Sequence, residues 1–147
     1  MAKAVTEKFD EMVLEVETAT PGTYAKLCGL VEVEVTRTAN VQTTPVPDCD
    51  DESKPHGMER EVESLEVTVS ATGVWAQSSH ETMMAWFYSG ASKNVRLGHL
   101  KASVGDTEYE TGPALLTNLG HSRVKGQKVS ASINIEFDGT PARSDKV

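Results

Sequence analysis

Residues 61–98 have the sequence EVESLEVTVSATGVWAQSSHETMMAWFYSGASKNVRLG, which predicts a strand, a turn, one helix and a second strand. From Leu65 to Ala71, apolar residues alternate with polar ones. That two-residue period is typical of a strand with one buried and one solvated face. Gly73 ends the alternation, and residues 93–97 are expected to form the returning strand.

The predicted helix lies between these two strands. Ser78 and Glu81 have the spacing of a capping box, in which side chains satisfy free N–H groups of the first helical turn. The residues that follow are apolar nearly all round, so the helix must be covered on more than one side, by the core alone or by a neighbouring subunit as well. Gly90 is expected to end it, because glycine tolerates a left-handed conformation. The residues predicted to hold the helix on the sheet are Met83, Trp86 and Phe87.

The rest of the chain predicts strands and no further helix. The same alternation, with β-branched residues prominent on the apolar side, runs through several segments. They are residues 11–17, 24–27, 31–36, 107–119 and 129–137, with a hairpin turn expected at residues 121–127. Because 147 residues suit one domain, we predict a single domain over residues 1–147. It is expected to be mainly β, an antiparallel β-sandwich or barrel with one short α-helix.

The composition of the chain excludes several classes of function. With 22 acidic against 14 basic residues, the net charge of −8 argues against a surface that holds nucleic acid by releasing counterions from phosphates. No apolar run approaches the ~20 residues of a membrane span, and the charged N-terminus does not resemble a signal peptide. We therefore expect a protein made in the cytoplasm, with Cys28 and Cys49 as free thiols.

Three segments lack the strand pattern. Residues 1–10 are expected to form a flexible N-terminal arm, and residues 138–147 a polar C-terminal tail. Residues 37–60 are predicted to form a long loop, because prolines and an acidic cluster interrupt the alternation there. Loops of that length are uncommon in compact domains and are usually functional or disordered.

No motif predicts catalysis, a metal or a cofactor. The sequence has no Gly-x-Ser-x-Gly turn, no phosphate-binding glycine loop and no His-Glu-x-x-His pair. Cys28, Cys49 and His56 lack the spacing of a zinc site, and the acids of residues 48–52 lack the order of a calcium loop. We interpret that acidic cluster as a solvated loop tip, and we predict a non-enzymatic protein with no cofactor and no metal.

Four local motifs stand out from the generic strand pattern. They are VPDCDD at residues 46–51, SATGV at 70–74, MAWFYSG at 84–90 and KNVR at 93–96. Together with the order of elements over residues 22–139, they resemble the major tail tube protein of long-tailed bacteriophages and phage-like gene transfer agents. The resemblance implies a β-sandwich whose subunits form hexameric rings, which stack into a hollow tube that conducts DNA. The needle-tube protein of type VI secretion, which shares this fold, is the alternative.

The resemblance also implies partners and a location. The protein would be a structural component of the virion tail or of a gene transfer agent particle, assembled in the host bacterial cytoplasm. Its partners would be copies of itself, the tape measure protein, the tail terminator and the distal tail proteins, with no membrane. DNA would pass through the lumen without specific binding.

Two sets of residues are assigned roles in such a tube. Glutamates that lie opposite apolar stripes are expected to line one common lumen, where an acidic surface keeps DNA sliding. They are Glu32, Glu34, Glu66, Glu108, Glu110 and Glu136. Residues 37–60 are expected to connect stacked rings, because a proline-rich acidic segment supplies no core and needs a contact to become ordered. The residues singled out in this loop are Val46, Pro47, Asp48, Asp50, Asp51 and Glu52.

Overall fold

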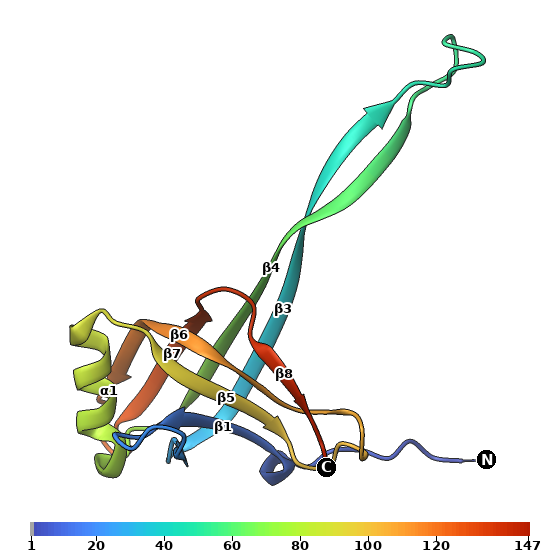
Figure 1. Ribbon diagram of the computed structural model, residues 1–147. Coiled ribbons are helices and arrows are strands. Elements are labelled where there is room, and N and C mark those ends of the chain that lie inside the picture. Colours follow the sequence, from blue (N-terminus) through green and yellow to red (C-terminus); the bar gives the residue numbers. More distant parts are fainter. Residues whose placement is uncertain (1) are drawn as a thin grey trace.

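The computed structural model describes residues 2–147 and folds them into one antiparallel sheet with a single α-helix (Figure 1). The strands are β1 (Met12–Glu17), β2 (Tyr24–Lys26), β3 (Leu30–Val46), β4 (Gly57–Val74), β5 (Lys93–His99), β6 (Thr107–Ser122), β7 (Ser130–Phe137) and β8 (Ala142–Asp145). The helix α1 spans Gln77–Ser89, and the short 3-10 turn η1 spans Phe9–Glu11. The predicted fold class, mainly β and antiparallel with one short helix, is confirmed.

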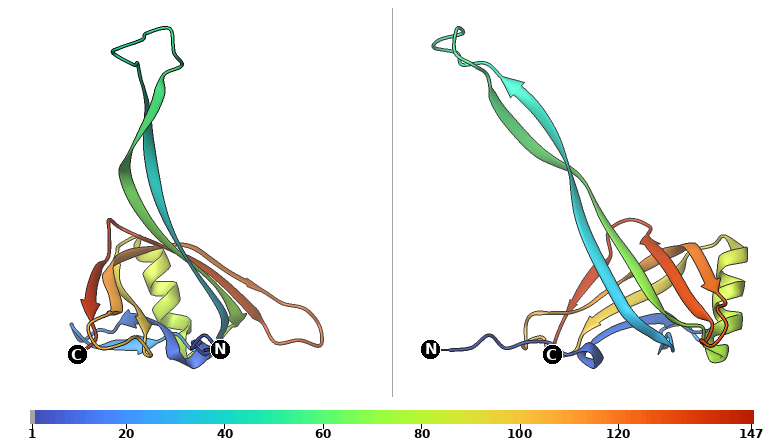
Figure 2. Two further views of the ribbon diagram at one scale, coloured as in Figure 1. Left: turned by 90° about the vertical axis from the view of Figure 1, so that its right-hand side faces the viewer. Right: turned by 180° about the vertical axis from the view of Figure 1, so that it is seen from behind.

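The sheet curls around a small apolar core. Its strand order is β2-β1-β5-β6-β7-β4-β3, with β8 paired to β6 beyond the end of β7. Leu14 of β1, the second strand of this order, and Val33 of β3, the last, line the same pocket, so the curl brings the two sides of the sheet near each other. Figures 1 and 2 show α1 standing against one side of the curled sheet. We call this part of the molecule the body.

The core of the body combines all the longer strands with the helix. Its most deeply buried large side chains are Leu97, Ile135, Val69 and Val95, each less than 2% exposed. From α1, Met83 and Trp86 enter the same cluster. Phe87, the third residue predicted to pack there, is 39% exposed and meets Tyr88 of its own helix edge to face. The helix therefore packs on the core through the face that carries Met83 and Trp86, and it leaves Phe87 and Tyr88 exposed near its C-terminal end.

The two ends of α1 differ from each other in how well the sequence predicts them. The capping box predicted at Ser78 is wrong, because the N-cap is Ala76, two residues earlier, and no side chain caps the helix. The Trp75 N–H donates to the Val129 carbonyl at 2.8 Å, which ties the chain to the start of β7 and leaves only Ala76 between strand and helix. The predicted end is confirmed: Gly90 has a left-handed φ of 66°, and its N–H donates to Phe87.

The loop predicted at residues 37–60 is wrong for most of its length. β3 and β4 stay paired from Leu30 opposite Gly73 to Val46 opposite Gly57, so the loop shrinks to residues 47–56. A β-bulge between Asn40 and Val41 shifts the register and breaks the simple alternation. Because β3 is an edge strand, its proline is tolerated. The result is a long twisted hairpin that projects far from the body (Figures 1 and 2).

The terminal segments also differ in part from the prediction. The polar tail at residues 138–147 contains β8, which pairs with β6 from Thr107 to Thr111. At the other end, residues 2–8 form no helix or strand, and Figure 1 shows this arm extending away from the body. The first residue of the predicted arm, Met1, lies outside the described residues. Within residues 2–147, no helix is long and apolar enough to cross a membrane.

Candidate functional surfaces

Four of the six glutamates assigned to the lumen lie on the exposed face of the sheet. Glu34 of β3 pairs with Ser70 of β4, and Glu136 of β7 pairs with Thr68 two positions along β4. Because alternate residues of a strand share a face, these positions lie opposite the core residues such as Val69. The four are Glu32, Glu34, Glu66 and Glu136, all of them exposed. We call this surface of β3, β4 and β7 the outer face.

The outer face is acidic and hydroxyl-rich. Between the glutamates it carries small polar side chains at alternate positions of the three strands. They are Thr36, Thr38, Ser64, Thr68, Ser70, Thr72, Ser130, Ser132 and Asn134. On these three described strands, the register places no Lys or Arg on the outer face. The surface therefore offers hydrogen-bonding groups and negative charge but no cation to pair with a phosphate.

Glu108 and Glu110 do not share that face, so the prediction that all six glutamates lie on one surface is wrong. Glu110 of β6 pairs with Leu97 of β5, a core residue, and is only 8% exposed. Glu108 lies two residues earlier on the same side of β6 and is 4.0 Å from the Lys146 ammonium. The predicted alternation within β6 is correct. Which of its two faces lies on the core side, however, is set by pairing with β5, which is distant in sequence.

The buried Glu110 has a specific partner, which the sequence did not indicate. The Arg37 guanidinium donates two hydrogen bonds to its carboxylate, one of them from Nε to Oε2 at 3.1 Å. This hydrogen bonding raises the pKa of Arg37 above its ordinary value. A buried carboxylate without such a partner is costly. The pair therefore joins β6 of the body to β3 at the point where the hairpin leaves it.

A second ion pair lies on the same side of the sheet as the outer face, near the β1 edge. Arg96 of β5 donates to Glu15 of β1 at 3.0 Å, and its guanidinium lies over the rings of Tyr24 and Tyr109. Burial raises the pKa of Tyr24, the nearby Glu17 raises it further, and Arg96 opposes both. The cluster links β1, β2, β5 and β6 and leaves the Arg96 charge already paired.

The residues assigned to the inter-ring loop lie at the end of the hairpin. Val46 is the last residue of β3, and the rest belong to residues 47–56, which we call the tip. The Asp48 carboxylate accepts hydrogen bonds from the N–H groups of Asp50 and Asp51. Asp51 accepts from both the hydroxyl and the N–H of Ser53, which lowers its pKa. The tip is thus shaped by its own carboxylates, and Cys49 is exposed within it.

The curled sheet with one helix and a long projecting hairpin is the fold of tail tube subunits. The chain is similar to one in the tail of an empty GTA particle solved with C6 symmetry, with a TM-score of 0.74, 13% identity, and 95% of this chain and 99% of that chain covered. A chain in the virion of a native gene transfer agent (GTA) particle gives 0.70 and 13%, with the same coverage. The SPP1 tail tube gives 0.71 and 11%, covering 97% of this chain and 81% of that one. At such identities the likeness shows the fold alone.

Sequence comparison identifies the family directly. A family model described as phage tail tube protein matches residues 6–143, so the chain belongs to the phage tail tube protein family. No curated protein sequence matches the chain significantly. Of the two families that the sequence left open, the match is to the phage one, and the family is a structural one.

Proposed function

We propose that this chain is the repeating subunit of a tail tube, in which six copies form a ring and the rings stack around a channel for DNA. The C6 symmetry of the GTA tail that shares the fold supports the six-fold ring. The observation that carries the proposal is the outer face, which gathers Glu32, Glu34, Glu66 and Glu136 across three strands without a basic residue among them. This face lines the lumen.

An acidic lumen suits a duct for a polyanion. Protein surfaces that hold DNA do so by contacts from Lys and Arg to phosphates, which release counterions. The outer face has no such group on β3, β4 or β7, so DNA passing these strands meets carboxylates and neutral side chains and no cation that would hold its phosphates. The channel therefore conducts DNA without retaining it. Glu108 and Glu110 take no part, because they lie on the core side of β6.

The hairpin formed by β3 and β4 connects successive rings. Toward the hairpin, Thr68 is the last residue of β4 that pairs with β7. Beyond it, β3 and β4 continue as a two-stranded ribbon to Val46 and Gly57. The ten residues of β3 beyond Thr36, residues 37–46, span about 34 Å at the rise of an antiparallel strand. An isolated two-stranded ribbon is marginal in water, so a neighbouring subunit stabilises it. The tip, including Pro47, Asp48, Asp50, Asp51 and Glu52, then lies against the next ring.

The wider role follows from the tube. The protein is a structural component of the virion tail or GTA particle with no catalytic function, assembled in the host cytoplasm. Its own copies are its main partners. The tape measure protein, the tail terminator and the distal tail proteins meet the lumen and the two ends of the tube.

Electron cryomicroscopy of tubes assembled from the purified protein tests this proposal. We expect stacked six-fold rings in which the outer face points toward the tube axis. A reconstruction with Glu34 and Glu136 on the outside wall would contradict the acidic lumen. Replacing residues 41–57 by a short Gly-Ser turn should leave a folded subunit that forms no long tubes, and long tubes from that variant would rule out the hairpin as connector.

A further inference from the structure

The hairpin beyond the body has two chemically different faces. On one, the cross-strand pairs are Ala39 with Leu65, Val41 with Val62, and Pro45 with Met58. On the other, they are Thr38 with Glu66, Asn40 with Ser64, Gln42 with Glu61, and Thr44 with Glu59. Thr43 and Arg60 form the one polar pair within the first face. We call that first face, made of Ala39, Val41, Pro45, Met58, Val62 and Leu65, the apolar stripe.

The apolar stripe continues the core face of the sheet. Leu65 lies two residues from Val67 on β4, and Val67 is buried in the body. Along the hairpin the same face loses its cover: Val41, Met58, Val62 and Leu65 are 48–60% exposed. The acidic face of the hairpin likewise continues the outer face. A row of half-exposed apolar side chains on an otherwise polar ribbon marks an interaction surface.

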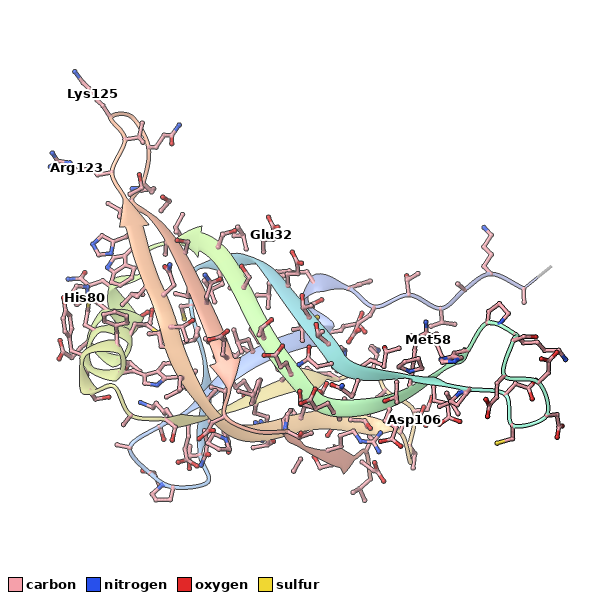
Figure 3. The ribbon with its side chains drawn as sticks, turned by 90° about the horizontal axis from the view of Figure 1, so that it is seen from above. Glu32, Met58, His80, Asp106, Arg123 and Lys125 are labelled. Atoms are coloured by element: carbon pink, nitrogen blue, oxygen red, sulfur yellow. The ribbon has the colours of Figure 1, made fainter. Side chains whose placement is uncertain are left out.

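The opposite end of the same sheet carries complementary groups. The turn between β6 and β7, residues 123–129, holds Arg123, Lys125 and Lys128 and no acidic residue. Ser130, just after this turn, pairs with Val74, the last residue of β4. The tip is joined to the opposite end of β4, at Gly57, so the turn and the tip lie at opposite ends of this strand. Figure 3 shows Arg123 and Lys125 pointing outward at one end of the molecule and Met58 on the hairpin toward the other.

The basic end also has uncovered apolar side chains. Val124 within the turn is 51% exposed, and Val74 beside it is 45% exposed. We define the basic end as Val74, Arg123, Val124, Lys125 and Lys128. At the tip, four acids stand against one base, Lys54, which lies 3.9 Å from Asp48. The hairpin and the basic end thus complement each other in two respects. The hairpin offers the apolar stripe and an acidic tip, and the basic end offers exposed apolar side chains among basic ones.

We propose that the apolar stripe and the tip of one copy dock on the basic end of a second copy, while the acidic face of the hairpin stays in solvent. This deepens the proposed function, on which it rests, since the second copy is then a subunit of the next ring. The contact joins two different surfaces at opposite ends of the sheet, so it can repeat from ring to ring along the tube axis as an open stack. The stripe provides the buried area, and the unlike charges select the orientation. The acidic face of the hairpin then extends the lining of the lumen.

The first experiment compares the two faces of one strand. In the double variant Val62→Ser, Leu65→Ser, the stripe loses its apolar surface, and the protein concentration needed for tubes should rise about tenfold or more. The matched control is Glu61→Ser, which lies on the acidic face beside Val62 and should form tubes as the native chain does. Sedimentation and negative-stain microscopy measure the tubes, and circular dichroism checks that each subunit is folded.

The second experiment reverses the charges. Asp50→Lys with Asp51→Lys should prevent stacking, and adding Arg123→Glu with Lys125→Glu should restore it, because each chain then carries the opposite pair of complementary ends. In native tubes made from mixed isotope-labelled chains, a thiol-to-amine cross-linker should join Cys49 of one chain to Lys125 or Lys128 of another. A Cys49→Ser chain should lose that product.

The outcomes separate the two proposals. If the native chain forms neither rings nor tubes, the proposed function fails and this inference with it. If the native chain forms tubes and the Val62→Ser, Leu65→Ser variant forms them equally well, this inference alone fails. It also fails alone if the variant with all four charges reversed forms no tubes and no link between Cys49 and the basic end appears. Loss of tubes only in the stripe and single-sided charge variants, with rescue, supports it.

Discussion

The body and the hairpin are built from the same pair of strands but differ in what stabilises them. On β4, Val69 in the body is 1% exposed, whereas Val62 on the hairpin is 60% exposed, although both lie on the same face of the antiparallel ladder, on either side of the bulge at Asn40 and Val41. Backbone pairing is therefore similar in the two regions, and burial is not. Since apolar burial is the main stabilising term, the body is self-sufficient and the hairpin depends on a partner.

The largest effect should come from the helix that covers the core. Trp86 is 4% exposed, and its indole N–H donates to the Ala91 carbonyl at 3.2 Å. Trp86→Ala removes both, so the free energy of unfolding of the unassembled subunit should fall by about 3–5 kcal/mol. Chemical denaturation measures it. Tyr88→Ala, an exposed neighbour on the same helix, is the control and should change it by less than about 0.5 kcal/mol.

The second effect compares the two regions on one strand. Val69→Ala leaves a cavity in the core and should cost the unassembled subunit about 2–3 kcal/mol. Val62→Ala makes the same chemical change on the hairpin, where no core surrounds it, and should cost less than about 0.5 kcal/mol. Equal costs in denaturation of the subunit would show that the hairpin is already packed, against the division drawn between the two regions.

A smaller effect is expected where the two regions meet. Arg37→Ala leaves the Glu110 carboxylate buried without its guanidinium partner. Because the Arg37 side chain is itself about half exposed, the loss of stability should be about 1–2 kcal/mol and not the larger cost of a fully buried pair. Glu110→Gln with Arg37→Ala should recover part of it. Arg60→Ala on the hairpin is the control, and a loss as large as that of Arg37→Ala would contradict this account.

The smallest effect concerns the tip. The hydroxyl and N–H of Ser53 hydrogen-bond to the Asp51 carboxylate and lower its pKa by favouring the charged form. Ser53→Ala removes the hydroxyl and should raise the Asp51 pKa toward its ordinary value. A depressed pKa means that the hydrogen bonds are present at neutral pH and weaken as the pH falls through that pKa. Carboxyl NMR shifts measure it, and an unchanged midpoint would mean that the tip lacks this order in solution.

The sequence predicted those parts of the fold in which one face of an element is buried. Residues 31–36 and 129–137 alternate because β3 and β7 cover the core there, and Gly90 marks the helix end through its backbone freedom. Residues 37–46 and 57–60 gave no such signal. Both faces of the hairpin meet solvent, and a bulge shifts the phase of β4 against β3, so a strand looked like a loop. The mistake thus falls on the region that lacks a core.

The candidate surfaces were predictable to a similar degree. Periodicity within β3, β4 and β7 correctly grouped Glu32, Glu34, Glu66 and Glu136 on one face, because each strand shows its apolar side. It could not place Glu110, whose side of β6 is set by pairing with Leu97 and whose charge is met by Arg37 from a distant strand. Contacts between residues far apart in sequence leave no local pattern. That the grouped glutamates line a lumen stays a prediction.

Hydrogen–deuterium exchange of the subunit and of assembled tubes tests most directly whether the hairpin depends on a partner. In the subunit, the amides of residues 58–66 should exchange fast and those of β7 slowly, since the ribbon opens without disturbing the core. In tubes, residues 58–66 should become protected while β7 stays slow. If residues 58–66 are already protected in the subunit, or still exchange fast in tubes, the hairpin does not owe its stability to the next copy.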